Sequence, residues 1–346
     1  GSDVGKSIIT TALCRVLAQK GLRVAPFKAQ NMSNNSGVTP DGLEMGRAQI
    51  VQAEAADIAP HVDMNPILLK PTSEVGCQVV VNGKVWANQS ARDYHERKAA
   101  LWRSACDALL RLRQQYEVVV LEGAGSCAEV NLMENDIVNL RMAAEAQAPV
   151  IVVGDIHRGG IFAQLVGTLA CLPEAHQKQV AGFIVNRFRG DLGLFETGVN
   201  WIEARTGRPV FGVLPWYTGF TIESEDSVVI EAPRQMTPDR IEGPAIAVLR
   251  LPHIANFTDM DTLGDVPGLG VHFLEQAQPL TGFKAVILPG SKNTRHDLNW
   301  LHTTGWTAML QAFARRGGHI LGICGGYQML GQRVEDPEGL EGPPGK

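Results

Sequence analysis

The stretch "HILGICGGYQMLG" (His319–Gly331) decides how the second half of this chain folds. An apolar run rises to Cys324, which stands between Gly322 and the pair Gly325-Gly326, and a helix-like segment follows. Small residues on both sides permit the sharp strand-to-helix turn that lifts a nucleophile clear of a sheet. They also offer little packing to a buried, inert cysteine, which is the competing interpretation. The pattern therefore predicts that Cys324 is a nucleophile.

A second segment belongs with this elbow. "VILPGSKNT" (Val286–Thr294) is a strand that ends in Gly290-Ser291, where backbone N–H groups could form an oxyanion hole. A thiol nucleophile ordinarily works with a histidine base. All nine histidines precede Cys324, and none has the setting of a base placed after the nucleophile. Either one of these histidines serves, or the base lies in sequence that is absent here.

The chain opens on another motif, Gly5-Lys6-Ser7, directly before the amphipathic pattern of Ile8–Lys20. In a phosphate-binding loop of the Walker type, backbone N–H groups at a helix start cradle phosphate. The lysine neutralises its charge, and the serine hydroxyl can bind Mg²⁺. The tripeptide alone fits a structural turn equally well. Its position at the head of a strong helix favours nucleotide binding.

Polar residues also follow two predicted strands. Glu122 comes directly after Val118–Leu121 and precedes a glycine-rich turn, which places it at the carboxyl edge of a sheet. A carboxylate there suits Mg²⁺, although it could instead cap the next segment. One strand later, Asp155 and His157 stand in "GDIHRGG". For His157 a polar loop histidine is the simpler interpretation.

The segment "APFKAQNMSNNSG" (Ala25–Gly37) brings Lys28, Gln30 and Asn31 just past a predicted strand. A lysine and several amides in one loop make little sense as core packing. They suit an anionic or amide-bearing ligand.

Strand and helix patterns alternate through the first two-thirds of the chain, which predicts a parallel, doubly wound α/β sheet. The predicted strands of this part are Val24–Phe27, Val118–Leu121, Val150–Val153, Val180–Val185 and Val210–Leu214. The predicted helices are Ile8–Lys20, Arg97–Tyr116 and Phe162–Leu172. The pattern breaks around a proline-rich segment, and a second set of strands follows at Ile246–Leu251, Gly270–Leu274, Ala285–Leu288 and His319–Ile323. We predict one domain over residues 1–228, a linker over 229–244 and a second α/β domain over 245–346.

Composition narrows the class of protein. A net charge of -5 over 346 residues gives no reason to expect nucleic acid or an anionic membrane as a partner. No apolar run reaches the roughly 18 residues that span a bilayer. The six cysteines are scattered, without metal-ligand spacing, which predicts a reducing, cytoplasmic setting.

Taken together, the residues closely resemble the cobyric acid synthases, the glutamine-dependent amidotransferases of cobalamin biosynthesis. Nine runs in order along nearly the whole chain carry this resemblance: "SDVGKS", "PFKAQNMSNNSGVTPDGLEMGRAQ", "NPILLKPTSE", "EGAGSCAEVNL", "DIVNLRMA", "GFIVNRFRGD", "RLPHIANFTDMD", "LPGSKNT" and "GICGGYQMLG".

The resemblance implies a phosphate-loop amide ligase domain, similar to dethiobiotin synthetase, and a class I glutamine amidotransferase domain. The first would use ATP and Mg²⁺ to phosphorylate carboxylates of a corrin substrate, adenosylcobyrinic acid a,c-diamide. The second would release ammonia from glutamine through a Cys-His-Glu triad. Four corrin carboxylates would be amidated in succession to give adenosylcobyric acid.

Site residues follow by position in the matching runs. Cys324 corresponds to the nucleophile and Gly290 to the oxyanion turn. The resemblance places the other functional residues in the ligase domain: Gly5, Lys6 and Ser7 in the phosphate loop, Glu122 and Ser7 on the metal, Asp136 near the triphosphate and acceptor carboxylate, and Lys28 and Asn31 beside nucleotide and substrate.

Three departures from the family pattern matter. The start of the longer phosphate loop and the strand before it are absent, and His157 stands where the family usually has a second aspartate. The family's triad histidine and glutamate lie beyond Lys346. Both ends of the chain therefore look cut, and the second domain looks truncated. We predict that the chain as given does not hydrolyse glutamine, whereas its ligase half could accept free ammonia.

Three other interpretations remain to be compared. Cobyrinic acid a,c-diamide synthase shares the architecture, but the "FKAQNMSNNS" loop favours cobyric acid synthase. A phosphate-loop ATPase acting as a partitioning or scaffold switch would not need "GICGGYQ" or "LPGSKNT". A non-catalytic remnant fits the truncated second domain, but the intact motifs of the ligase domain argue against it. The sequence does not predict the oligomeric state.

Overall fold

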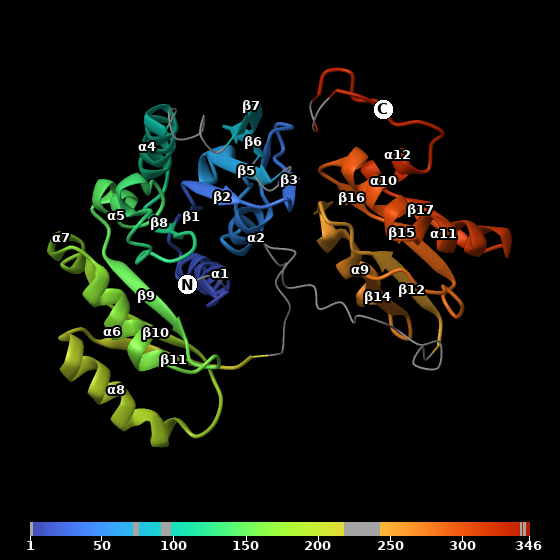
Figure 1. Cartoon of the computed structure of the whole chain (residues 1–346). Coiled ribbons are helices and arrows are strands. Elements are labelled where there is room, and N and C mark those ends of the chain that lie inside the picture. The colour runs from blue at the N-terminus through green and yellow to red at the C-terminus, as the bar shows by residue number, and fades with distance from the viewer. Residues whose placement is uncertain (1–2, 72–75, 91–97, 218–242, 340, 342–343) are drawn as a thin grey trace.

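The computed structural model describes residues 3–71, 76–217, 243–339, 341 and 344–346, apart from 91–97. Most of the predicted linker, residues 229–242, therefore lies outside the described residues. Figure 1 shows the amino-terminal part, blue to yellow, beside a separate carboxyl-terminal part drawn in orange and red. No helix within the described ranges is long and apolar enough to cross a membrane.

The first part contains two groups of parallel strands. Strand β1 (Val24–Phe27) pairs with β8 (Val118–Leu121), and β10 (Val180–Phe188) lies between β9 (Val150–Asp155) and β11 (Val210–Pro215). The helices of this part are α1 (Lys6–Gln19), α2 (Arg47–Ala55), α4 (Lys98–Gln115), α5 (Leu140–Ala146), α6 (Ile161–Cys171), α7 (Glu174–Gln177) and α8 (Leu192–Thr206), with short 3-10 turns η1 (Val62–Met64) and η2 (Met133–Asn135). The predicted strands and helices of this part are thus present, with shifts at their ends.

The sequence reasoning missed a small sheet above this core. Strands β2 (Gln30–Met32), β5 (Ile67–Pro71), β6 (Gly76–Val81) and β7 (Lys84–Ser90) form it, and β3 (Ser36–Val38) pairs with β4 (Glu44–Gly46) beside it. The turn between β6 and β7 is Asn82-Gly83, with φ of 48° and 78°. Asn-Gly between two apolar runs is the strongest local signal for a hairpin, so this signal was present in the sequence.

The second part is an α/β layer around four parallel strands. They are β12 (Ala245–Leu249), β14 (Gly270–Leu274), β15 (Ala285–Leu288) and β17 (His319–Gly322), in the order β14-β12-β15-β17. A short antiparallel pair, β13 (Ile254–Ala255) with β16 (Gly290–Ser291), lies at their carboxyl ends. The other elements are η5 (Phe257–Met260), α9 (Asp261–Gly264), α10 (Thr294–Thr303), α11 (Trp306–Arg315) and α12 (Gly325–Met329).

Burial explains why the second part folds as a unit. Helix α11 places Trp306, Leu310 and Phe313 on one face, and all three are buried against the sheet. Full burial of side chains of this size contributes about 2 kcal/mol each. The central strand β12 is apolar along its whole length and packs on both faces, as parallel strands do. The predicted α/β fold class is therefore confirmed.

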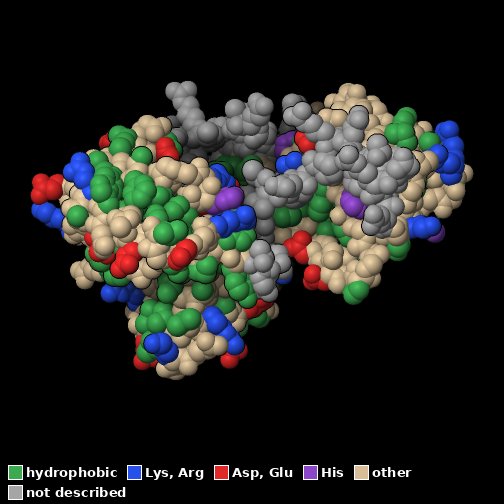
Figure 2. Space-filling view, turned by 90° about the horizontal axis from the view of Figure 1, so that it is seen from below, with side chains coloured by type: hydrophobic (Ala, Val, Ile, Leu, Met, Phe, Trp, Pro, Cys, Tyr) green, Lys and Arg blue, Asp and Glu red, His purple; other side chains and the backbone are tan. Residues whose placement is uncertain are grey.

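Hydrogen bonds join the two parts. The Asn256 carboxamide accepts from the Ser36 N–H at 3.0 Å, and the Thr258 hydroxyl donates to Asn35 Oδ1 at 3.1 Å. Lys292 Nζ donates to Gln78 Oε1 at 2.7 Å. The loop after β2, the start of β3 and strand β6 of the small sheet thus contact the segments around β13 and β16 (Figure 1). In Figure 2, acidic and basic side chains are interspersed over the visible surface, so neither sign dominates this face.

Candidate functional site

Glu122 is the centre of a buried polar cluster in the first domain. Strands β1 and β8 run in register, so the residues that follow them, Lys28 and Glu122, meet at one edge. The side chains of both are almost fully buried, and Lys28 Nζ lies 3.2 Å from Glu122 Oε1. The Ser7 hydroxyl donates to the same oxygen at 2.8 Å. Three residues predicted from distant motifs therefore converge on one carboxylate.

The phosphate loop leads directly into this cluster. Gly5 has φ of 91°, a left-handed conformation that suits glycine, and α1 begins at the next residue. Asn186, at the far end of the domain's sheet, donates to the Val4 carbonyl at 2.9 Å, and a Cβ at Gly5 would collide with its carboxamide. Lys6 Nζ donates to the Gly125 carbonyl at 3.1 Å. Asn186 was not predicted as a site residue, although it lies in one of the matching runs.

Helix α2 adds two glutamines that the sequence reasoning missed. Gln52 Nε2 donates to Glu122 Oε2 at 2.6 Å, and Gln49 Oε1 accepts from Asn31 Nδ2 at 3.3 Å. Both glutamines are fully buried. Their spacing of three residues puts them on one helix face, but nothing local in the sequence marks that face as lining a site.

Asp136 has hydrogen-bond partners different from those of Glu122. Its two oxygens accept from the N–H groups of Val138 and Asn139, which directly precede α5. It acts electrostatically on Cys127, whose pKa is raised by burial and by Asp136, while Lys6 opposes that shift. The charges of Asp136 and Lys6 thus act in opposite directions on the pKa of the same thiol. The proposed role of Asp136 near the triphosphate stays a prediction.

The residues after β9 form a separate charged group. Asp155 is buried and accepts from Arg187 Nη1 at 2.9 Å and from the His157 N–H at 2.8 Å. The His157 ring packs 4.7 Å from the Trp216 ring, centre to centre. The aromatic contact gives His157 a packing role, in line with the simpler interpretation.

The observed donors and acceptors fit Mg²⁺ and the phosphates of ATP. The Ser7 hydroxyl and the Glu122 carboxylate offer hard oxygen atoms of the kind Mg²⁺ prefers. Among the described residues, Gln52 Oε1 is a buried acceptor without a partner, which is the kind of atom that a hydrated cation can satisfy. Lys28 provides positive charge at the Glu122 carboxylate, and Lys6 provides it at the Gly125 carbonyl.

In the second domain Cys324 occupies a strained elbow. Its backbone angles are φ 50° and ψ −114°, and its side chain is exposed. Neighbouring glycines make the turn possible, because a Cβ at Gly322 would lie 2.6 Å from Tyr327 Cα and one at Gly326 would collide with the Leu288 carbonyl. No hydrogen bond from a histidine to Cys324 is found within the described part of the chain.

The predicted oxyanion turn faces this elbow. A Cβ at Gly325 would lie 3.0 Å from the Ser291 nitrogen, so β16 and the start of α12 are in close contact. Gly290 is equally close to β13, since a Cβ there would lie 3.2 Å from the Ala255 carbonyl oxygen. The structure therefore brings Gly290-Ser291 and the segment around Cys324 together.

Asp297 braces the oxyanion turn from behind and was not predicted. It is fully buried, and Oδ2 accepts from the Ser291 hydroxyl at 2.7 Å. Oδ1 lies 2.8 Å from His253 Nδ1 and 3.4 Å from His296 Nδ1. These contacts fix the positions of β13 and β16 around one carboxylate.

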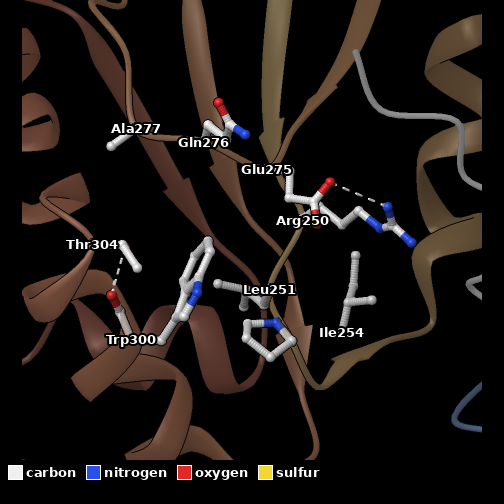
Figure 3. A pocket seen from close by; sticks show the side chains of 9 residues that line it. Arg250, Leu251, Ile254, Glu275, Gln276, Ala277, Trp300 and Thr304 are labelled. Carbon is white, nitrogen blue, oxygen red and sulfur yellow. Dashed lines mark hydrogen bonds and ion pairs between the residues drawn. The ribbon is translucent and has the colours of Figure 1, made fainter. Parts of the chain in front are cut away.

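A cavity of about 590 Å³ opens beside this brace, at the carboxyl ends of β12 and β14. Figure 3 shows Trp300 projecting into it opposite the ion pair of Arg250 and Glu275, whose closest atoms are 3.6 Å apart. Leu251 and Ile254 form its apolar floor. Cys324, which follows β17 at the other side of the sheet, does not line it.

Comparison with known proteins agrees with both halves of this description. Residues 1–228 match the family described as the CobQ/CobB/MinD/ParA nucleotide binding domain. Residues 245–346 match the CobB/CobQ-like glutamine amidotransferase domain. A partitioning or scaffold switch would not need the second domain.

About half of the residues of this chain are identical in individual relatives. Cobyric acid synthase of Chlorobaculum tepidum is 54% identical over 348 residues, which cover 99% of this chain and 69% of the relative. Cobyric acid synthase of Pelodictyon phaeoclathratiforme is 54% identical over 346 residues, with the same coverage. Cobyric acid synthase of Vibrio campbellii is 48% identical over 345 residues, which cover 100% of this chain and 72% of the relative. The chain therefore belongs to the cobyric acid synthase family.

Proposed function

We propose that the chain catalyses ATP-dependent amidation of corrin carboxylates, with adenosylcobyrinic acid a,c-diamide as acceptor and adenosylcobyric acid as product. The observation that carries this proposal is the convergence of Ser7 and Lys28 on buried Glu122, at the head of the phosphate loop. In this proposal residues 1–228 form the ligase, 229–244 the linker and 245–346 the amidotransferase domain.

The ligase step transfers a phosphoryl group and then replaces it. A carboxylate oxygen of the corrin attacks the γ-phosphorus of ATP, and the bond to the bridging oxygen breaks as ADP leaves. Ammonia then attacks the acyl carbon, phosphate leaves with the carbon–oxygen electron pair, and a proton passes to solvent. Lys6 and Lys28 would hold the anionic oxygens in place, with Asn31 beside the acceptor and Asp136 near the triphosphate.

Mg²⁺, when bound, would neutralise charge on the triphosphate. Ser7 and Glu122 would hold it, and Lys28 would move its ammonium group from Glu122 toward the transferring phosphoryl group. Gly5 allows the loop to approach the phosphates closely because it has no side chain.

In the amidotransferase domain, Cys324 is the proposed nucleophile toward the carboxamide of glutamine. Its sulfur would attack the amide carbon, ammonia would leave, and water would hydrolyse the thioester to glutamate. The N–H groups at Gly290-Ser291 would stabilise the oxyanion. Because the described residues give Cys324 no histidine partner, we expect ammonium to be the effective nitrogen donor.

The test is ATP-dependent amidation of the corrin a,c-diamide, followed by mass spectrometry, with ammonium or glutamine as donor. Amidated products with ammonium support the ligase assignment. Their absence with glutamine supports the prediction that the chain as given does not hydrolyse glutamine. No mass change with either donor would contradict the proposed ligase.

A pair of lysine variants makes this test specific. Lys28→Met removes the buried side-chain charge of Lys28 from the cluster. The amidation rate with ammonium as donor should fall by about two orders of magnitude or more, which is typical when one charged contact to the reacting group is lost. Lys20→Met changes an exposed lysine after α1 and should leave the rate unchanged.

A further inference from the structure

Gln52 of helix α2 leaves one polar atom of its side chain without a partner in a fully buried setting. Its Nε2 donates to Glu122 Oε2 at 2.6 Å, whereas its Oε1 has no hydrogen-bond partner in the described part of the chain. A buried acceptor left unsatisfied costs about 1–3 kcal/mol, so such atoms are rare in folded proteins.

The orientation of this amide follows from its neighbours. A carboxylate can only accept hydrogen bonds, so the nitrogen of Gln52 must face Glu122 and the oxygen must face away from it. Rotating the amide would place two acceptors against each other. The atom left without a partner among the described residues is therefore the carbonyl oxygen.

Its surroundings point to a hydrated cation. The Ser7 hydroxyl and Lys28 ammonium meet Glu122 on its other oxygen, so the carboxylate links Gln52 to the start of the phosphate loop. Mg²⁺ keeps several water molecules when it binds beside phosphates, and those waters need acceptors. We propose that Gln52 is a positioning residue of the metal site: its amide N–H orients Glu122, and its carbonyl oxygen accepts a hydrogen bond from the water shell of Mg²⁺. This inference rests on the proposed function.

Gln49 provides a matched comparison on the same helix face. It is equally buried and also leaves an atom without a partner, Nε2, but its other amide atom pairs with Asn31 instead of Glu122. The Asn31 amide is itself fixed, because its oxygen accepts from the Met32 N–H at 2.9 Å. The unsatisfied atom of Gln49 is thus a donor, and a donor cannot accept a hydrogen bond from water bound to a cation.

The experiment measures how strongly Mg²⁺ enhances nucleotide binding. The affinity of the whole chain for a fluorescent, non-hydrolysable ATP analogue is determined with excess Mg²⁺ and with EDTA, and the ratio of the two affinities is compared between variants. Gln52→Met should lower this ratio about tenfold while leaving the affinity in EDTA unchanged. Gln49→Met should keep the ratio of the unsubstituted chain.

A second variant covers the case in which Gln52→Met does not fold, as judged by circular dichroism. Gln52→Asn keeps the amide but shortens the side chain by one methylene, so its N–H no longer reaches Glu122 Oε2 and its carbonyl oxygen is withdrawn from the site. The ratio should fall as it does in Gln52→Met. An unchanged or higher ratio in folded Gln52→Met or in folded Gln52→Asn would overturn the inference. If the unsubstituted chain binds no nucleotide under either condition, the proposed function fails instead.

Discussion

At the scale of single residues, Cys324 has a backbone conformation that residues other than glycine rarely adopt. Its φ of 50° and ψ of −114° lie outside the common left-handed well, so the elbow holds strain of about 1–3 kcal/mol. In this conformation Cys324 is exposed beside the oxyanion turn.

The strain predicts an unusual order of stability among Cys324 variants. Cys324→Gly relieves it, whereas Cys324→Ala retains it, so the glycine variant should be more stable by about 1 kcal/mol despite its more flexible unfolded chain. Denaturant unfolding of both variants, followed by tryptophan fluorescence, measures the difference. Equal stabilities, or a more stable alanine variant, would show that the elbow is unstrained.

Glu44 titrates in a way that the fold sets. Burial opposes its ionisation, but the charge of Lys70 and hydrogen bonds from Lys70 and Ser36 outweigh burial and hold the pKa of Glu44 below its usual value. A lowered carboxyl pKa stabilises the fold above the unfolded-state pKa of about 4.3, and the contribution is lost as pH falls through the folded-state pKa.

Glu44→Gln should therefore lose about 1 kcal/mol of unfolding free energy at neutral pH and nothing in strong acid. Urea unfolding of both proteins between about pH 7 and pH 3 measures the gap, which should close as pH falls. A gap that stays constant across this range would contradict the assignment.

At the scale of elements, α12 is held against β15 so closely that only glycine fits at the contact. A Cβ at Gly326 would collide with the Leu288 carbonyl and lie 2.6 Å from that of Pro289. Neither carbonyl can move without disturbing the sheet.

Gly326→Ala should consequently destabilise the second domain by about 3 kcal/mol or more and slow alkylation chemistry at the displaced elbow. Gly167→Ala is the matched control, because this helical glycine of α6 has open space around it and should gain about 0.5–1 kcal/mol. Thermal unfolding and iodoacetamide labelling of Cys324 test both. A tolerated Gly326→Ala would mean that α12 is free to shift.

Elements that alternate regularly were predictable, and those set by distant contacts were not. The strands around Val24 and Val118 followed from apolar runs, and the residues after them, Lys28 and Glu122, were correctly placed at a sheet edge. Gln52 and Asp297 escaped prediction because their roles depend on Glu122, 70 residues from Gln52, and on His253, 44 residues from Asp297, which only the folded chain brings close. The hairpin around Asn82-Gly83 was missed although its turn signal was in the sequence.

At the scale of the whole molecule, the two domains touch through residues that adjoin both sites. The Ser36 N–H and Asn35 side chain lie in the loop that follows Asn31, and their partners Asn256 and Thr258 directly follow β13. Strand β13 pairs with β16, the oxyanion turn. Hydrogen bonds between the domains thus join the segment after Asn31 to the residues after β13, and β13 pairs with the oxyanion turn beside Cys324.

This contact predicts that ligand binding in one domain stabilises the other. A Mg²⁺-bound ATP analogue should raise the melting temperature of both domains in calorimetry, since binding to one folded domain is linked to its contacts. Asn256→Gly combined with Thr258→Val removes two of the three side-chain hydrogen bonds described above between the domains, so it should reduce the rise in the second domain. Glycine suits position 256 because Asn256 has φ of 50°.

Thr303→Val is the control, since this exposed hydroxyl bonds only within α10. It should leave the linked rise intact. If the double variant also shows the full rise in both domains, the domains communicate by another route.

The short pairing of β13 with β16 also bears on how the two halves can be recombined. One strand of this pair carries the docking residues and the other the reactive turn, so neither can be replaced alone. A chimera that takes its second domain from another amidotransferase needs more than a compatible linker. It must exchange residues 34–36 and 254–258 as a matched set, because hydrogen bonds between the domains join these two segments.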